Sequence, residues 1–467
     1  MDERSAGELA RLCRADLVGD PGSRVGPDVV IDSRAVTPGA LFVALAGENT
    51  DGHHFVGQAA AAGAGAALVR HSVAVDIPCL VVDDTLAGLG RLAAGVVAEA
   101  RTGQLRCIGI TGSSGKTSTK DLLSQICESV GPTVSPVGSF NNEIGVPLTA
   151  ARVDSSTQFL ISEFGSRGIG QLSQLSKIVP IDTAVVLNVG TAHLGEFGSV
   201  ENVARAKGEL AEAASEWVVL NDDDALVRRM DRLTTAKVAA FSVGAAPKLG
   251  ELRVWATGLR ADALQRHSFT AHVSGVDEST AEINLQVSGE HQVANALAAL
   301  GAALTQGVEF AVAAAALNQA VARSKWRMEL VTGANGLLIV NDAYNANPDS
   351  MRAALSALAG MRRSGGRIIA LLGDMLELGE TAAQAHQEIG RFAAQHGVDL
   401  LVALGDQRDA LVRGASAGGI AAIAAPGRDE AIAEVLSFAT PDDVVLVKAS
   451  RGLALESVAE RLGASES

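Results

Sequence analysis

Short apolar runs alternate with helix-like patterns along most of this 467-residue chain. Strands of a parallel sheet are buried on both faces, so they read as continuous apolar runs, whereas helices place apolar residues three or four positions apart. The alternation predicts βα units and an α/β fold. Strands are expected at residues 41–45, 67–69, 79–82, 107–110, 158–162, 183–188, 336–340, 368–372, 400–404 and 444–447.

The same pattern predicts three domains, as the length of the chain also suggests. Residues 1–102 are expected to form an N-terminal α/β domain that binds a substrate, and residues 103–324 a central domain built on a parallel sheet. Residues 325–467 are expected to form a doubly wound, Rossmann-like domain. Between residues 252 and 287 the apolar positions alternate with period two, which predicts a small antiparallel insertion in the central domain.

A glycine-rich loop connects the predicted strand at residues 107–110 to a helix whose apolar side carries Leu122, Leu123, Ile126 and Val130. Such a loop lets backbone N–H groups converge on phosphate oxygens at a helix N-terminus. A lysine at its end adds a positive charge, and the next hydroxyl is a ligand for Mg²⁺. We interpret the loop as the nucleotide site of a P-loop ATPase-like domain, rather than as a turn with a solvated lysine. Its residues are Thr111, Gly112, Ser113, Ser114, Gly115, Lys116 and Thr117.

Three further residues of the central segment are candidates for a site beside the phosphates. Glu163 and His193 follow predicted strands, and a carboxylate is an ordinary Mg²⁺ ligand whereas histidine is an unusual one. Lys207 falls on the apolar stripe of a helix that starts near Ser199. An unpaired buried ammonium is costly, so Lys207 has a partner or a role, or else extends from the edge of the stripe to solvent.

Polar clusters follow two predicted strands of the third segment, at residues 341–348 and 373–379. The carboxyl ends of parallel strands are where ligands bind in open α/β sheets. The first cluster contains Tyr344, the single tyrosine of the chain. Turn formation and helix capping would by themselves account for Asn347 and Asp374, so these two residues are weaker candidates.

Composition excludes several classes of function. The chain has 38 Lys and Arg against 53 Asp and Glu, a formal charge of −15, which argues against general binding of nucleic acid or anionic membranes. The four cysteines show no zinc or disulfide pattern, and no signal sequence or apolar stretch of about 18 to 20 residues is found. These features predict a soluble cytoplasmic protein with no membrane insertion.

Several stretches together resemble the Mur ligases, a family of ATP-dependent amide-bond-forming ligases. The resemblance rests on residues 111–117, 140–149, 206–209, 289–296 and 326–329, and it covers nearly the whole chain. Residues 341–348 and 373–379 are most similar to the branch that joins D-alanyl-D-alanine to UDP-N-acetylmuramoyl-tripeptide in peptidoglycan synthesis. Ser139 departs from the family, which commonly has Asn there.

The resemblance implies roles that spacing alone does not reveal. ATP and Mg²⁺ would bind at the loop, with Thr117, Glu163, His193 and Lys207 as metal ligands and Lys207 carbamylated by CO₂. The residues implied to be catalytic are Lys116, Lys207, His193 and Arg327. Asn295 would approach the adenine, Arg327 the γ-phosphate and Asp342 the ribose. Substrate contacts are expected from Ser33 and Arg34 at the UDP end, and from Asn141, Asn142, Tyr344 and Asn345.

The implied reaction activates a carboxylate as an acyl phosphate, which the amine of the dipeptide then attacks. Catalysis of this kind depends on positioning and charge neutralisation, so it needs cations and no protein nucleophile. We expect a monomer. Two alternatives stay open: another amide ligase with the same core, such as a folylpolyglutamate synthetase-like or diamino-acid-adding enzyme, and a P-loop module that uses ATP only as a conformational switch.

Overall fold

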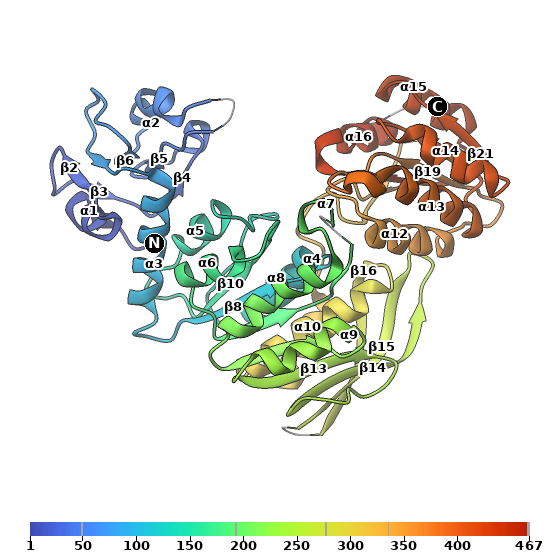
Figure 1. The fold of residues 1–467 in the computed structure, drawn as a ribbon, viewed down its shortest axis with the longest axis horizontal. Coiled ribbons are helices and arrows are strands. Elements are labelled where there is room, and N and C mark those ends of the chain that lie inside the picture. Colours follow the sequence, from blue (N-terminus) through green and yellow to red (C-terminus); the bar gives the residue numbers. More distant parts are fainter. Residues whose placement is uncertain (48–49, 192–193, 276–277, 335, 465–467) are drawn as a thin grey trace.

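The structure is a computed structural model that describes residues 1–47, 50–191, 194–275, 278–334 and 336–464. Figure 1 shows three lobes: the N-terminal lobe (blue) and the C-terminal lobe (orange to red) lie at opposite ends, and the central lobe (green to yellow) joins them. Each lobe is built around its own main sheet, and all three main sheets are dominated by parallel pairs. The α/β prediction is therefore confirmed, while the predicted boundaries at residues 102 and 324 stay predictions.

The N-terminal lobe has a five-stranded sheet in the order β2-β7-β6-β5-β4, in which only β2 is antiparallel to its neighbour. A two-stranded ribbon of β1 and β3 lies apart from it. The strands are β1 (Arg4–Ser5), β2 (Asp16–Val18), β3 (Arg24–Val25), β4 (Val29–Val30), β5 (Leu41–Val43), β6 (Ala66–Val69) and β7 (Cys79–Val81), and the helices are α1 (Ala6–Cys13), α2 (Val56–Ala61) and α3 (Thr85–Ala100).

The central lobe has a nine-stranded sheet in the order β16-β15-β14-β13-β12-β11-β8-β10-β9. Its strands are β8 (Arg106–Thr111), β9 (Thr133–Val134), β10 (Phe159–Glu163), β11 (Thr183–Val186), β12 (Trp217–Asn221), β13 (Lys237–Val243), β14 (Leu252–Ala261), β15 (Arg266–Ser274) and β16 (Ser279–Ser288). Its helices are α4 (Lys116–Glu128), α5 (Gly145–Ala150), α6 (Gln171–Ile178), α7 (Leu194–Phe197), α8 (Val200–Ala213), α9 (Ala225–Arg228), α10 (His291–Thr305) and α11 (Phe310–Gln319).

Two details of the central lobe differ from the sequence predictions. The period-two strands β14, β15 and β16 do not form a separate insertion, because β14 pairs in parallel with β13 and so extends the main sheet. Helix α4 ends at Glu128, so Val130 lies beyond its apolar side and is exposed. Strand β8 lies between β10 and β11, which makes its carboxyl end a switch point where ligands of open α/β sheets bind.

The C-terminal lobe has a six-stranded sheet in the order β17-β18-β22-β19-β20-β21, with only β17 antiparallel. Its strands are β17 (Glu329–Thr332), β18 (Leu338–Asn341), β19 (Ile368–Leu372), β20 (Leu400–Ala403), β21 (Ala421–Ala424) and β22 (Val444–Lys448). Its helices are α12 (Pro348–Gly360), α13 (Ala382–Gln395), α14 (Arg408–Ala417), α15 (Arg428–Phe438) and α16 (Glu456–Ala464).

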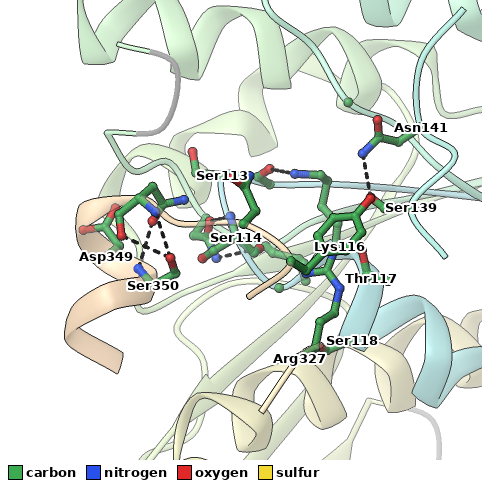
Figure 2. A pocket seen from close by; sticks show the side chains of 18 of the residues that line it. Ser113, Ser114, Lys116, Thr117, Ser118, Ser139, Asn141, Arg327, Asp349 and Ser350 are labelled. Carbon is green, nitrogen blue, oxygen red and sulfur yellow. Dashed lines mark hydrogen bonds between the residues drawn. The ribbon is translucent and has the colours of Figure 1, made fainter. Parts of the chain in front are cut away.

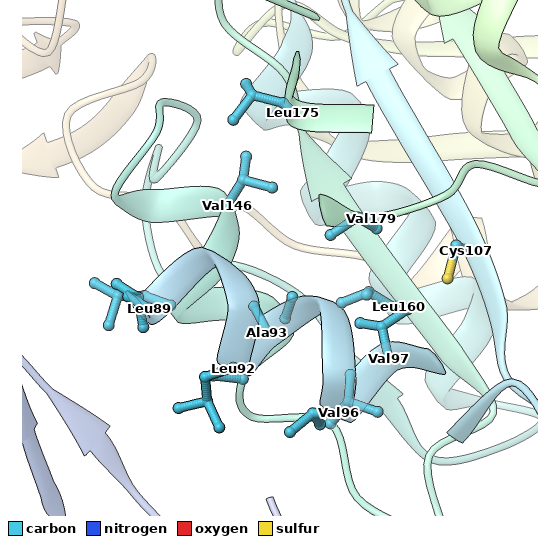
Figure 3. Packing of buried hydrophobic residues seen from close by; sticks show 14 of the residues in the cluster. Leu89, Leu92, Ala93, Val96, Val97, Cys107, Val146, Leu160, Leu175 and Val179 are labelled. Atoms are coloured by element: carbon cyan, nitrogen blue, oxygen red, sulfur yellow. The ribbon is translucent and has the colours of Figure 1, made fainter. Parts of the chain in front are cut away.

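Helix α3 packs against elements of both the N-terminal and the central lobe. Asp84 caps its N-terminus by accepting hydrogen bonds from the backbone N–H groups of Leu86 and Ala87. The helix packs on α1 and β6 of the N-terminal lobe and also on α5 and α6 of the central lobe. Figure 3 shows this junction, where Val97 of α3 lies near Leu160 and Val179 of the central lobe. The N-terminal and central lobes therefore share one continuous apolar cluster.

Candidate active site

A cavity of about 680 Å³ lies where the central and C-terminal lobes meet. It is lined by the glycine-rich loop after β8, by residues after β10 and β11, and by the two polar clusters of the C-terminal lobe. Parallel strands bring their carboxyl ends to one edge of a sheet, which explains why these separate sequence motifs converge. Figure 2 shows Ser113 and Ser114 on one side of the loop and Asp349 and Ser350 of α12 facing them.

The glycine-rich loop leads directly into helix α4, whose first residue is Lys116. Gly115 has φ of +82°, and a Cβ there would lie 2.4 Å from Asn295 Oδ1, so only glycine fits. The Lys116 ammonium donates to the carbonyl oxygen of Gly112 at 2.8 Å, across the concave side of the loop. Burial lowers the pKa of Lys116, against the opposite effect of Glu163, and Arg327 adds to the lowering. This geometry suits an anion at the helix N-terminus.

Glu163, the last residue of β10, is 1% exposed and is held by three side-chain donors. Thr117 Oγ1 donates to its Oε2 at 2.8 Å, and Ser139 Oγ and Asn141 Nδ2 each donate to its Oε1 at 2.8 Å. Burial raises the pKa of Glu163, but Lys116, Arg327 and these hydrogen bonds outweigh it, so the pKa is lowered overall. Glu163 is therefore an ionised carboxylate next to the Thr117 hydroxyl, and both are oxygen donors of the kind that Mg²⁺ prefers.

Lys207 lies on the buried side of α8, as its position on the apolar stripe predicts. The helix is capped by Ser199, whose side chain accepts from the backbone N–H of Asn202. Lys207 is 4% exposed, lines the cavity, and has neither a hydrogen-bond acceptor nor a carboxylate partner among the described residues. Burial holds the pKa of Lys207 well below its usual value, and the positive charge of Lys116 adds to this. The lowered pKa favours the neutral amine, which is the form that reacts with CO₂.

Arg327 reaches the cavity from the segment that connects the two lobes, and Figure 2 shows it extending toward Lys116 and Thr117. Its guanidinium carbon lies 4.2 Å from the centre of the Tyr344 ring. Among the described residues, the buried Arg327 Nε finds no acceptor. Lys116 and Arg327 therefore bring positive charge to one place in a chain that is acidic overall, as a polyphosphate ligand requires.

Asp342, at the end of β18, is held by a lysine that sequence reasoning missed. Lys448, the last residue of β22, is 2% exposed and donates to Asp342 Oδ2 at 2.6 Å and to the carbonyl oxygen of Asn345 at 2.9 Å. Asp342 Oδ1 accepts the backbone N–H of Met328 at 3.1 Å. Parallel pairing of β18 with β22 brings the two residues together across a sequence separation that no local pattern could reveal.

Most of the predicted site residues line this one cavity. They are Gly112, Ser113, Ser114, Gly115, Lys116, Thr117, Asn141, Asn142, Glu163, Lys207, Asn295, Arg327, Asp342, Tyr344 and Asn345. Thr111 is buried in β8 beside the loop, and its hydroxyl donates to the carbonyl oxygen of Phe164 at 2.9 Å. His193, predicted as a metal ligand, lies outside the described residues.

Ser33 and Arg34 lie in the N-terminal lobe and do not line the cavity. The Ser33 hydroxyl donates to Gln58 Oε1 at 3.0 Å, and the exposed Arg34 pairs with Asp32 at 2.7 Å. His291 lines the cavity and belongs to the recognised stretch 289–296, but no role was predicted for it. No signal in the sequence was recognised for other cavity residues, among them Asp349, Lys448, Ser450 and Arg451.

Comparison with known proteins assigns the chain to a family. The sequence matches the Mur ligase family, catalytic domain, at residues 28–95, the Mur ligase middle domain at 110–303, and the Mur ligase, glutamate ligase domain, at 326–451. The chain belongs to the Mur ligase family. This makes it an amide-bond-forming ligase with a P-loop-containing central domain, and the predicted family resemblance is confirmed.

Relatives with curated names agree with one branch of the Mur ligases. A Mycobacterium tuberculosis protein named UDP-N-acetylmuramoyl-tripeptide--D-alanyl-D-alanine ligase is 42% identical, over 95% of this chain and 93% of its own. The Escherichia coli protein of the same name is 34% identical, over 93% of each chain. The similarity extends through all three lobes, so it includes the C-terminal clusters on which the predicted branch rests.

Solved structures of Mur ligases share the whole architecture. MurF from Acinetobacter baumannii superposes with a TM-score of 0.85 at 31% identity, covering 99% of both chains. MurF from Thermotoga maritima, solved in complex with ADP, has a TM-score of 0.73 at 27% identity and covers 93% of this chain and 97% of its own. None of the helices in the described part of the chain is both long and apolar enough to cross a membrane.

Proposed function

We propose that this chain uses ATP to join D-alanyl-D-alanine to UDP-N-acetylmuramoyl-tripeptide, in the cytoplasmic stage of peptidoglycan synthesis. The single observation that carries the proposal is the cavity between the central and C-terminal lobes, in which a phosphate-binding loop faces the two polar clusters of this branch of the family. The names of the relatives support the same substrates.

The chemistry needs a carboxylate to become a good acyl donor, because a free carboxylate does not condense with an amine in water. The terminal carboxylate of the tripeptide attacks the γ-phosphate of ATP, ADP leaves, and the amine of the dipeptide displaces phosphate from the acyl phosphate. Lys116 and Arg327 are proposed to neutralise the charge on the transferred phosphoryl group, since both project into the same part of the cavity. Asn295 is proposed to contact the adenine, and Asp342 is proposed to contact the ribose.

The residues present fit a bound Mg²⁺. Thr117 and the ionised Glu163 offer two adjacent oxygen donors, and His193 is proposed as a further ligand. Lys207 is proposed to carry a carbamate, because its lowered pKa favours the neutral amine, which can add CO₂ with release of a proton. The carbamate would then supply oxygen ligands in place of a repelling positive charge. When bound, the ion would supply charge neutralisation at the phosphates.

The remaining site residues are proposed to position the two substrates. Ser33 and Arg34 would hold the UDP end in the N-terminal lobe. Asn141 and Asn142 face the cavity beside Glu163, and Tyr344 and Asn345 face it from the C-terminal lobe. The substrate would therefore extend from one lobe to the next, with its reacting carboxylate near Lys116.

A coupled assay of ADP release tests the proposal. Release should require both UDP-muramoyl-tripeptide and D-alanyl-D-alanine, and D-glutamate or diaminopimelate should not replace the dipeptide. Lys116→Ala should lose turnover by about 100-fold or more, because it removes a charge directed at the phosphates. Its thermal midpoint should stay near that of the parent protein, because the one hydrogen bond it removes among the described residues is that to the Gly112 carbonyl oxygen. Efficient turnover of a single amino acid with a shorter UDP-muramoyl precursor would place the enzyme in another branch, and ATP turnover without any acceptor would favour the switch alternative.

A further inference from the structure

The segment that connects the central and C-terminal lobes holds Arg327 between two residues in a strained backbone conformation. Trp326 has φ of +60° and Met328 has φ of +52°, a left-handed region that side chains with a Cβ seldom adopt. Such conformations persist only where surrounding contacts fix them, and they concentrate at functional sites. The contacts that hold the main chain and the side chain of Arg327 are therefore evidence for its function.

The chain before Arg327 is fixed to the helix that follows the phosphate loop. Arg323 forms a two-point ion pair with Glu128 of α4, at 2.6 Å for each contact, and the backbone N–H of Ser324 donates to Asp121 Oδ2 at 2.9 Å. Gln125 of α4 also exchanges hydrogen bonds with the backbone of Val321, at 2.9 and 3.1 Å. These contacts fix the start of the segment relative to Lys116, which is the first residue of the same helix.

The chain around Arg327 is fixed to the C-terminal lobe by the loop after β18. The backbone N–H of Tyr344 donates to the carbonyl oxygen of Trp326 at 3.1 Å, and Asp342 accepts the N–H of Met328 at 3.1 Å. The main chain on both sides of Arg327 is thus held by this loop. One contact uses the backbone N–H of Tyr344 and the other the Asp342 side chain, so a substitution of the Tyr344 side chain leaves both in place.

The Arg327 side chain itself has a single specific contact in the described part of the chain, which is the ring of Tyr344 at 4.2 Å. It forms no ion pair with a described residue, and its buried Nε has no acceptor. An aromatic ring attracts the flat face of a guanidinium within about 6 Å. The N–H groups lie in the guanidinium plane and so stay free to donate to a phosphate.

We propose that Tyr344 is a positioning residue whose ring, not its hydroxyl, holds Arg327 in the direction of the transferred phosphoryl group. The inference rests on the proposed function, because it assigns Arg327 to the γ-phosphate. Without the ring, a long arginine side chain would sample many rotamers in the cavity and lose its fixed direction. The Arg327 charge already acts on Lys116 and Glu163 across the cavity, so its end lies close to where the phosphates are expected.

Binding measurements separate the ring from the hydroxyl. Tyr344→Leu should weaken the affinity for a non-hydrolysable ATP analogue by about 10-fold, whereas ADP, which lacks the γ-phosphate, should bind as it does to the parent protein. Tyr344→Phe keeps the ring and should lose only about 2-fold. Unchanged ADP affinity also shows that each variant is folded. In turnover, Tyr344→Leu should lower kcat by about 10-fold, and Tyr344→Phe should restore it to within about 2-fold of the parent protein.

A double-mutant cycle with Arg327→Ala tests whether Tyr344 acts through Arg327. In the Arg327→Ala background, Tyr344→Leu should cause no further loss of affinity for the analogue. Phe392→Leu is the matched control, because Phe392 stacks on Arg352 in the same lobe, does not line the cavity, and should leave analogue affinity unchanged.

Two results would overturn the proposal: an equal loss in Tyr344→Phe and Tyr344→Leu, which would assign the role to the hydroxyl, or the same loss in the presence and absence of Arg327. Both readouts use nucleotide binding alone. A parent protein that binds the analogue but releases no ADP with both substrates would instead contradict the proposed function, so the two failures are distinguishable.

Discussion

At the scale of single residues, the charged groups of the site are oriented by contacts from distant parts of the chain. Lys116 and Lys207 were predicted from a loop pattern and from an apolar stripe, which are local features. The three donors around Glu163 come from a helix and a loop far from it in the sequence, so no local pattern joins them. Ser139 illustrates this limit, because the residue that departs from the family's Asn is, in the structure, a hydrogen-bond donor to Glu163.

Replacement of Lys207 tests the carbamate. Lys207→Ala should be nearly inactive yet folded, since it removes a buried amine without a partner, and short carboxylates at high concentration should partly restore turnover by occupying the vacated space. Lys207→Arg should not be restored, because its larger cation fills the space and stays charged. Parent protein equilibrated with ¹³C-labelled bicarbonate should show a carbamate carbon signal by NMR that Lys207→Ala lacks. Full activity of Lys207→Ala, or no such signal in active enzyme, would exclude the modification.

His291 in the cavity wall predicts a pH dependence of stability. Burial lowers the pKa of His291 to about 4, and Lys448 and His267 also lower it, against the opposite effect of Asp342. The unfolded chain binds a proton below its ordinary pKa of about 6.5, whereas the folded protein does not until about pH 4. Stability should therefore fall as the pH falls through this window, by at most about 1.4 kcal/mol per pH unit from this group.

Urea unfolding of the parent protein and of His291→Gln at several pH values between 7 and 4 measures this contribution. Carboxylates titrate in both proteins, so the difference between their slopes of unfolding free energy against pH isolates the contribution of His291. This slope should be shallower in His291→Gln. Equal slopes would mean that His291 is protonated equally in the folded and unfolded chains.

At the scale of elements, apolar periodicity was sufficient to predict the position of strands and helices that are long and have a regular buried face. Strands β10, β19 and β22, and helix α8, lie within one or two residues of their predicted positions. The two-residue strands β1, β3 and β4 were not predicted, because pairing with a partner defines them and no periodicity fits in so short a run. Strand β17 was missed in the same way, as an antiparallel edge of an otherwise parallel sheet.

The antiparallel strands show how far periodicity reaches. The alternation in residues 252–287 gave the type of pairing correctly, because one face of those strands is buried and the other is not. Periodicity could not reveal that β14 continues the central sheet, because nothing in the sequence of β13 indicates which strand will pair with its edge. The connecting segment was likewise recognised by its Arg327 and not by its backbone conformation, which depends on contacts with both lobes.

At the scale of the whole molecule, the site exists only where lobes meet. The phosphate loop, Glu163 and Lys207 belong to the central lobe, while Asp342, Tyr344 and Lys448 belong to the C-terminal lobe, and Arg327 lies between them. The family resemblance implied roles for all of these residues except Lys448. Spacing alone predicted the phosphate loop, Glu163 and Lys207 as candidates, and that the chemistry of two segments would have to converge. The buried members of the apolar clusters in the C-terminal lobe all come from residues 328–462, and Leu264 of the β14–β15 turn packs against one of these clusters.

Helix α3 limits how this enzyme can be divided into working parts. A cut after residue 102 follows the predicted domain boundary, yet it would remove from the central lobe a helix whose Leu92, Val96 and Val97 are fully or nearly fully buried in the shared cluster. The fragment 103–467 should therefore expose the apolar surfaces of α5 and α6 and aggregate when produced alone. Produced together with the fragment 1–102, it should form a soluble complex that binds ADP, as size-exclusion chromatography and calorimetry would reveal. A monodisperse fragment 103–467 would mean that α3 is dispensable and that the N-terminal lobe is a detachable module.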